Sequence, residues 1–245
     1  MAMGMSRERV KIVAFLFNDT EAAQRIDVDS FLRAFKLSEQ QMRFVNVHDT
    51  APSLSMLDGV NGVVIGGSRK SVWEDIPNGA ALAEVIKAAR AKKIPIIGIC
   101  FGAQFLAHIF GGKVVRDAQR EERGTYEITT SDDSFTDLLF ADAPFTFMAQ
   151  CAHHDCITVP PAGSVVLASS ELCPVQAFAI SGADVYGLQF HPERNKTDYE
   201  RGLALRGQQD PSQKPATDAI AAKLQESPEA EAILARFIDR IVLPR

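Results

Sequence analysis

The segment IPIIGICFGAQFLAHIFGG, residues 94–112, constrains the fold of this chain more than any other. Its first part is typical of a buried strand, and its second part has the spacing of an apolar helix. Cys100 stands at the junction, with Gly98 and Gly102 two residues to either side. A strand that turns sharply into a helix and holds a reactive side chain clear of the sheet needs small residues at those positions. We therefore predict a strand, a tight turn at Cys100 and a helix.

Cys100 is predicted to be a nucleophile. The free N–H groups and the dipole of a helix N-terminus favour the thiolate, which is the reactive form of the side chain. The alternative is that Cys100 packs as a small hydrophobic residue, as unpaired cysteines commonly do. We expect that structural role for Cys151, Cys156 and Cys173, whereas the flanking glycines favour chemistry at Cys100.

Short apolar runs alternate with helical patterns over the first half of the chain. Strands are expected near residues 10–17, 43–47, 62–67 and 94–100, and helices near 26–36, 78–93 and 101–110. This alternation predicts a parallel sheet with right-handed crossovers, helices on both faces and a ligand site at the carboxyl ends of the strands. From 113 to 190 most segments resemble strands, so we expect an antiparallel portion to join the parallel one.

The C-terminal part divides into two segments of different composition. Residues 196–217 are polar and end in RGQQDPSQKPAT, which predicts a surface loop. Residues 218–245 predict one or two amphipathic helices, interrupted near Ser227 and Pro228. A chain of 245 residues suits one domain, so we expect a single domain over 1–245 with a core over about 10–195.

The composition argues against several classes of protein. A net charge of −5 without a dense Lys/Arg run argues against a nucleic-acid partner. The 4 cysteines include no CxxC pair and fit neither a zinc site nor a secreted disulfide framework, so a reducing cytoplasm is the simplest compartment. MAMGMSRER lacks the apolar core of a signal peptide, and no apolar stretch approaches about 18 residues. We therefore expect neither export nor a membrane span.

A cysteine nucleophile needs a base, and the base needs an acceptor that orients it. His191, in YGLQFHPERN, directly follows an apolar strand pattern, and Glu193 lies two residues later. At the end of a strand, one ring nitrogen can face the thiol while the other pairs with the carboxylate. We therefore predict His191 and Glu193 as the partners of Cys100.

The other histidines carry weaker signals. His48 and His108 are expected to pack or to face solvent. His153 and His154 lie in the HHD segment between two strand patterns, and either could enter the pocket. We predict His153 as a substrate contact. No histidine spacing suggests a metal site.

Donors for an oxyanion are expected at the end of an earlier strand. GVVIGGSRKSVWED ends its strand pattern with Gly66 and Gly67, and a glycine pair lets backbone N–H groups approach a substrate closely. The N–H of Gly67 and that of Phe101, which follows the nucleophile, would form a two-donor oxyanion hole. An ordinary strand-to-loop turn is the alternative for this glycine pair.

Taken together, GICFGAQFLAHIFGG, YGLQFHPE, IGGS and HHD resemble the class I, or triad, glutamine amidotransferases, a domain also found in GMP synthetase. The resemblance runs from about residue 10 to about residue 195. It implies a flavodoxin-like three-layer α/β sandwich, with a mostly parallel central sheet and an antiparallel extension, and it implies no cofactor. Two positions depart from the family pattern: Ser68 replaces the usual proline, and His154 replaces a glycine and could narrow the pocket.

The resemblance also implies a role for each matched residue. Cys100 would attack the side-chain amide of glutamine, His191 would relay the proton, and Glu193 would orient His191. A γ-glutamyl thioester would form as ammonia leaves, and water would then release glutamate. The matched positions expected to contact the substrate or its oxyanion are Gln104, Gly66 and Gly67.

Three hypotheses follow for the activity. The leading one is hydrolysis of glutamine, with ammonia delivered to an acceptor on a partner synthetase. The second keeps the same triad and cleaves another γ-glutamyl amide or peptide without a partner. The third is a regulatory or binding subunit, which the presence of Cys100, His191 and Glu193 disfavours.

Overall fold

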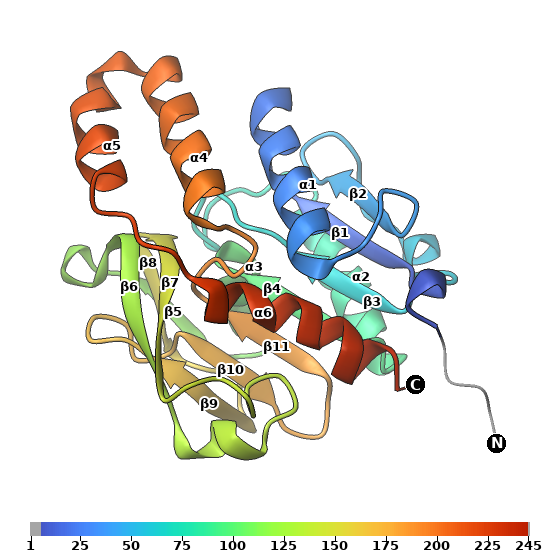
Figure 1. The fold of residues 1–245 in the computed structure, drawn as a ribbon. Helices are drawn as coiled ribbons and strands as arrows, with labels where there is room; N and C mark the ends of the chain where they lie inside the picture. Colours follow the sequence, from blue (N-terminus) through green and yellow to red (C-terminus); the bar gives the residue numbers. More distant parts are fainter. Residues whose placement is uncertain (1–5, 245) are drawn as a thin grey trace.

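The computed structural model describes residues 6–244, and its centre is one sheet of nine strands in the order β2-β1-β3-β4-β11-β10-β9-β6-β7 (Figure 1). Neighbours from β2 to β11 run parallel, and neighbours from β11 to β7 run antiparallel. A separate antiparallel pair consists of β5 and β8. The strands are β1 (Ile12–Leu16), β2 (Met42–Asn46), β3 (Gly62–Ile65), β4 (Ile96–Ile99), β5 (Lys113–Arg116), β6 (Glu122–Thr130), β7 (Thr146–His153), β8 (Asp155–Val159), β9 (Ser164–Ser169), β10 (Ala177–Ile180) and β11 (Val185–Leu188).

Helices cover both faces of the parallel half of the sheet. Its central strands β1, β3, β4 and β11 are therefore buried at every residue. One face packs against α1 and α6, and the opposite face packs against α2 and α3. Alternate side chains of β1 enter the two cores: Leu16 packs on the first side and Phe15 on the second. The three-layer α/β sandwich predicted from the sequence is therefore confirmed. The helices are α1 (Glu21–Phe35), α2 (Gly79–Ala91), α3 (Phe101–Ile109), α4 (Lys196–Gln209), α5 (Lys214–Ala221) and α6 (Pro228–Arg236).

Short helical segments complete the described chain. A π-helical stretch, Phe237–Val242, continues α6, and its Phe237 and Ile238 are buried in the core beside α1. The predicted interruption of the C-terminal helices is confirmed, since Ser227 stands just before α6 and Pro228 is its first residue. The 3₁₀ helices are Arg7–Arg9, Leu54–Leu57, Ala118–Arg120, Asp132–Thr136 and Pro211–Gln213.

The prediction of a loop over 196–217 was wrong, because α4 and α5 occupy most of that segment. The side-chain oxygen of Asn195 accepts a hydrogen bond from the N–H of Asp198 at 2.8 Å, which caps the first turn of α4. Only Asp198, Tyr199 and Gly207 are buried along α4, so its sequence shows no apolar stripe. In Figure 1, α4 and α5 stand as an antiparallel pair at one end of the molecule, with α4 beside α1. We call residues 196–221 the helical cap.

The bonding state of the cysteines also differs in part from the prediction. Cys156 and Cys173 form a disulfide, so the expectation that both remain free was wrong. They are 17 residues apart in the sequence, but their Cα atoms lie 6.1 Å apart, a distance that a disulfide can span. Cys100 and Cys151 are free and buried. The single-domain boundary and the cytoplasmic location stay predictions.

Within the described chain, none of the helices combines the length and the apolar character that crossing a membrane requires.

Candidate active site

Cys100 occupies a strained turn between β4 and α3, with φ 54° and ψ −108°. Residues with a side chain rarely adopt a positive φ. Two glycines permit the turn: a Cβ on Gly98 would lie 2.5 Å from the carbonyl carbon of Gly102, and a Cβ on Gly102 would lie 2.2 Å from the carbonyl oxygen of Ile65. Neither position can hold a larger residue without displacing backbone. The strand, the turn and the helix predicted around Cys100 are all present.

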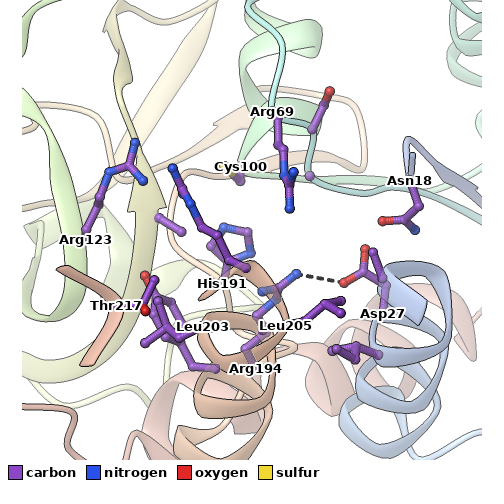
Figure 2. Close-up of a pocket in the computed structure, with 18 of the residues that line it drawn as sticks. Asn18, Asp27, Arg69, Cys100, Arg123, His191, Arg194, Leu203, Leu205 and Thr217 are labelled. Carbon is purple, nitrogen blue, oxygen red and sulfur yellow. Dashed lines mark hydrogen bonds and ion pairs between the residues drawn. The ribbon is translucent and has the colours of Figure 1, made fainter. Parts of the chain in front are cut away.

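His191 is brought beside Cys100 because β11 pairs with β4 in the middle of the sheet. Nδ1 of His191 lies 2.6 Å from Oε1 of Glu193, and both side chains are buried. Nε2 of His191 has no hydrogen-bond partner among the residues that the structure describes. Figure 2 shows the His191 ring next to Cys100. The structure thus assembles the three residues that the sequence analysis selected.

The charges around His191 determine its protonation state. Burial lowers the pKa of His191, but the interactions of its ring with Glu193 and Cys100 outweigh burial and raise this pKa to about 10. Burial raises the pKa of Glu193, but the positive charges of His191 and Arg194 outweigh it and lower that pKa. Each partner therefore favours the charged form of the other, an imidazolium facing a carboxylate. An imidazolium can donate a proton to a departing amine.

Gly67 borders both side chains. A Cβ at Gly67 would lie 3.3 Å from Cε1 of His191 and 3.9 Å from Cβ of Cys100. Phe101 is the first residue of α3, where backbone N–H groups have no partner within the helix. Gly66 faces away from the thiol, because its Cβ position adjoins Leu16. Of the glycine pair, Gly67 is therefore the one that borders Cys100 and His191.

Gln104 and His153, predicted as substrate contacts, are both buried and engaged within the protein. Nε2 of Gln104 donates to the carbonyl oxygen of Asp155 at 2.9 Å and to Oε1 of Gln189 at 3.2 Å. The ring of His153 bonds to the carbonyl oxygen of Asp155 at 3.0 Å and to Oε2 of Glu122 at 2.7 Å. Neither side chain lines the cavity beside Cys100. Their contact with substrate stays a prediction.

A cavity of about 470 Å³ opens onto Cys100, His191, Glu193 and Gly67. This volume lies within the range of roughly 300–1,000 Å³ that is usual for small-molecule sites. α1 forms one wall, β6 and β7 form another, and the helical cap closes a third side through residues from Tyr199 to Ile220 (Figure 2). His154, which was expected to narrow the pocket, does not line this cavity.

One buried cluster has the side chains of a metal site. Ligand-type atoms of Glu122, Cys151 and His153 lie within 4.8 Å of one another. The Glu122 carboxylate, however, already accepts hydrogen bonds from His153, Ser170 and Gln176. These contacts satisfy the carboxylate without an ion, and the expectation that the protein needs no metal stays a prediction.

The family model described as glutamine amidotransferase class-I matches residues 28–205, which is most of the chain. The chain belongs to the class I glutamine amidotransferase family. The resemblance inferred from the sequence motifs is therefore confirmed. The match ends within α4, so the end of that helix and all of α5 lie outside the part that this amidotransferase shares with the family model.

Relatives of this amidotransferase include GMP synthases described as glutamine-hydrolyzing. The protein from Ligilactobacillus salivarius is 32% identical over 180 residues, which cover 74% of this chain and 31% of the relative. The protein from Geobacillus kaustophilus is 35% identical over 144 residues, which cover 58% of this chain and 26% of the relative. The amidotransferase thus spans only about a quarter to a third of the length of these relatives.

Solved structures share the fold of this amidotransferase. A glutamine amidotransferase from Thermotoga maritima aligns with a TM-score of 0.78 at 21% identity, over 96% of this chain and 98% of that chain. A glutamine amidotransferase from Methylobacillus flagellatus aligns with a TM-score of 0.70 at 19% identity, over 94% of this chain and 94% of that chain. Both matches support the three-layer architecture.

Three residues that hold the site together were missed by the sequence analysis. Nη2 of Arg194 bonds to Oδ1 of Asp27 at 2.7 Å, and Nε of Arg194 lies 3.5 Å from Oε1 of Glu193. Nη2 of Arg33 donates to the carbonyl oxygen of Glu193 at 2.7 Å. Asp27 and Arg33 belong to α1, far from Glu193 in the sequence. The available signal was the position of Arg194, directly after the predicted acceptor.

Proposed function

We propose that the protein hydrolyses the side-chain amide of glutamine through a covalent intermediate on Cys100. The thiolate of Cys100 attacks the amide carbon and forms a carbon–sulfur bond, while the N–H groups of Gly67 and Phe101 bind the oxyanion. The His191 imidazolium gives its proton to the nitrogen, the carbon–nitrogen bond breaks and ammonia leaves. Water, deprotonated by His191, then attacks the γ-glutamyl thioester and releases glutamate and the thiolate.

One observation carries this proposal. A strained cysteine turn lies beside a buried histidine–glutamate pair, and all three residues open onto the same cavity. A structural cysteine has no need of a positive φ, and a structural histidine has no need to stand beside a cysteine thiol while a carboxylate holds its other ring nitrogen. The family membership supports glutamine as the substrate.

The relatives suggest where the ammonia goes. They are named GMP synthases, and this chain matches only about a quarter to a third of their length. We propose that an acceptor site on a partner enzyme receives the ammonia from this chain. Co-purification with a synthetase that raises glutamate release would support the transfer.

The first prediction concerns the nucleophile. Cys100→Ala is expected to lower the rate of glutamate release from glutamine by at least about a thousandfold, because no covalent intermediate can form. The rate is measured by a coupled glutamate assay. Cys151→Ala, which replaces the other free buried cysteine, serves as the matched control and should keep its activity. Equal activity in wild type and Cys100→Ala would refute the proposal.

A second candidate function, cleavage of larger γ-glutamyl amides, is favoured by the cavity. A volume of about 470 Å³ suits a ligand larger than a single amino acid. Faster turnover of γ-glutamyl peptides than of glutamine would establish this candidate. Binding of these compounds without any turnover would instead favour a regulatory subunit.

A further inference from the structure

Two arginines in the cavity have no acidic partner. Arg69, in the loop after β3, and Arg206, on α4, both line the cavity that contains Cys100. Neither forms an ion pair with any of residues 6–244. Nη2 of Arg69 makes one long contact, 3.5 Å, with Oε1 of Gln209. These two guanidinium groups therefore have donors available for an anion.

The other arginines of the cavity are paired with carboxylates. Arg194 pairs with Asp27 and Glu193, and Arg123 pairs with Glu121. Among the arginines that line the cavity, Arg69 and Arg206 are therefore the two without a carboxylate partner in the described chain.

Arg206 lies close enough to two other arginines of the cavity, Arg69 and Arg123, to be repelled by them. Burial lowers the pKa of Arg206, and the charges of Arg123 and Arg69 lower it further, against the smaller opposing effects of Tyr199 and Asp210. Figure 2 shows Arg69 and Arg123 on opposite sides of Cys100. A bound anion relieves this repulsion, and guanidinium groups bind a carboxylate with two parallel hydrogen bonds.

The position of the pair points to one part of a substrate. Arg206 lies beyond residue 205, where the match to the family model ends. Arg69 follows Ser68, the residue that departs from the family's usual proline. The cavity of about 470 Å³ that holds Cys100 is larger than one amino acid requires, and Arg69 and Arg206 both line it. A substrate with a larger amine beyond the scissile amide can therefore reach Arg69 and Arg206.

We propose that Arg69 and Arg206 bind a carboxylate on the amine side of a γ-glutamyl amide, so that the preferred substrates are γ-glutamyl amino acids or peptides. This inference rests on the proposed cleavage of γ-glutamyl amides by Cys100. It names the substrate class of that site. We call Arg69 and Arg206 the arginine subsite. Free glutamine carries only hydrogen on its amide nitrogen and leaves this subsite without a ligand.

The test compares two substrates that differ only in the distal charge, γ-glutamylglycine and γ-glutamylglycinamide. We expect wild type to cleave the acid with a kcat/KM at least about tenfold above that for the amide, since a hydrogen bond to a charged group is lost with the amide. Arg206→Ala and Arg69→Ala should each lower kcat/KM for the acid by about ten- to a hundredfold and change it for the amide by less than about threefold.

Two further variants separate recognition from a general loss of structure. Arg43→Ala, an exposed arginine on β2 far from the cavity, is the matched control and should leave both values unchanged. Arg206→Glu should favour a γ-glutamyl diamine, which carries a cation in place of the carboxylate, over γ-glutamylglycine. A reversed preference cannot result from unfolding. Equal losses on acid and amide in the arginine variants, or no preference in wild type, overturn the proposal.

Binding distinguishes failure of this subsite from failure of the proposed chemistry. If wild type cleaves neither compound, the catalytic proposal fails for these substrates, and the subsite is then judged by calorimetry on Cys100→Ala. Tighter binding of the acid than of the amide supports the subsite, and equal affinity refutes it.

Discussion

Cys100 stores backbone strain at the point where the chemistry is proposed. A positive φ at a residue with a side chain costs about 1–3 kcal/mol, which the surrounding structure must supply. That support comes from the close approach of Gly98 to Gly102 and of Gly102 to Ile65, and from the N–H of Cys100, which donates to Leu188 at 2.7 Å. The turn is therefore held from β3, α3 and β11 together.

Substitutions at two glycines near Cys100 are predicted to have different effects, one on stability and the other on activity. Gly102→Ala places a Cβ against the carbonyl oxygen of Ile65, so it should lower the free energy of unfolding by about 1–3 kcal/mol in urea denaturation. Gly67→Ala crowds Cε1 of His191 at 3.3 Å, so it should lower kcat by up to about a hundredfold with little change in stability. The same loss of stability in both variants would contradict this assignment.

The pH dependence should follow the charge of Glu193. The His191 imidazolium is present below its pKa and is lost as the pH rises through that value, which Glu193 helps to raise. Glu193→Gln removes this negative charge, so the pKa of His191 falls and the imidazolium is lost at a lower pH. The alkaline limb of the kcat profile should therefore move to lower pH, measured by glutamate release across a buffer series. An unmoved limb would show that His191 does not act as the acid.

Some residue roles followed from local sequence and others did not. Glu193 is two residues from His191, so their pairing depends on one strand end and could be predicted. Arg194 pairs with Asp27 across 167 residues, a partner that only the packing of α1 against that loop determines. Gln104 illustrates the same limit, because its side chain bonds to Asp155 and Gln189 inside the protein.

At the scale of elements, α4 shows why a polar helix was taken for a loop. Apolar periodicity detects helices that bury a stripe of side chains, and α4 buries little. It is anchored instead by polar contacts: Arg33 of α1 bonds to Oδ2 of Asp198 at 2.6 Å and to Oε2 of Glu231, near the start of α6, at 2.5 Å. One α1 arginine thus connects two C-terminal helices to the loop that carries Glu193.

Loss of that arginine should loosen the helical cap. Arg33→Ala is expected to lower the free energy of unfolding by about 1–2 kcal/mol, a figure reduced by solvent screening because 36% of the side chain is exposed. Arg25→Ala on the same helix removes an ion pair with Asp29 that is more exposed, and it should change stability by less than about 0.5 kcal/mol. Urea denaturation of both variants checks the difference. Equal effects would mean that Arg33 is an ordinary surface residue.

At the scale of the whole molecule, the site depends on the order of strands in the sheet. The strands were predictable from apolar runs, and so was the change from a parallel to an antiparallel arrangement. The adjacency of β4 and β11 could not be predicted in this way. β11 comes after the antiparallel strands in the sequence, but it returns to the centre of the sheet to pair with β4. The disulfide between Cys156 and Cys173 depends on the same kind of long-range packing.

The helical cap stands apart from the residues that are proposed to perform the reaction. The strained turn and its histidine stand on the central sheet, whereas Arg206 and the α5 wall stand at the end of α4 and on α5, beyond the family match. Substitutions in this segment, away from the contact between Arg33 and Asp198, can alter which compounds enter while the strained turn is kept. A protein built this way can acquire new selectivity by changes in a peripheral segment, while its proposed bond-breaking machinery is inherited intact.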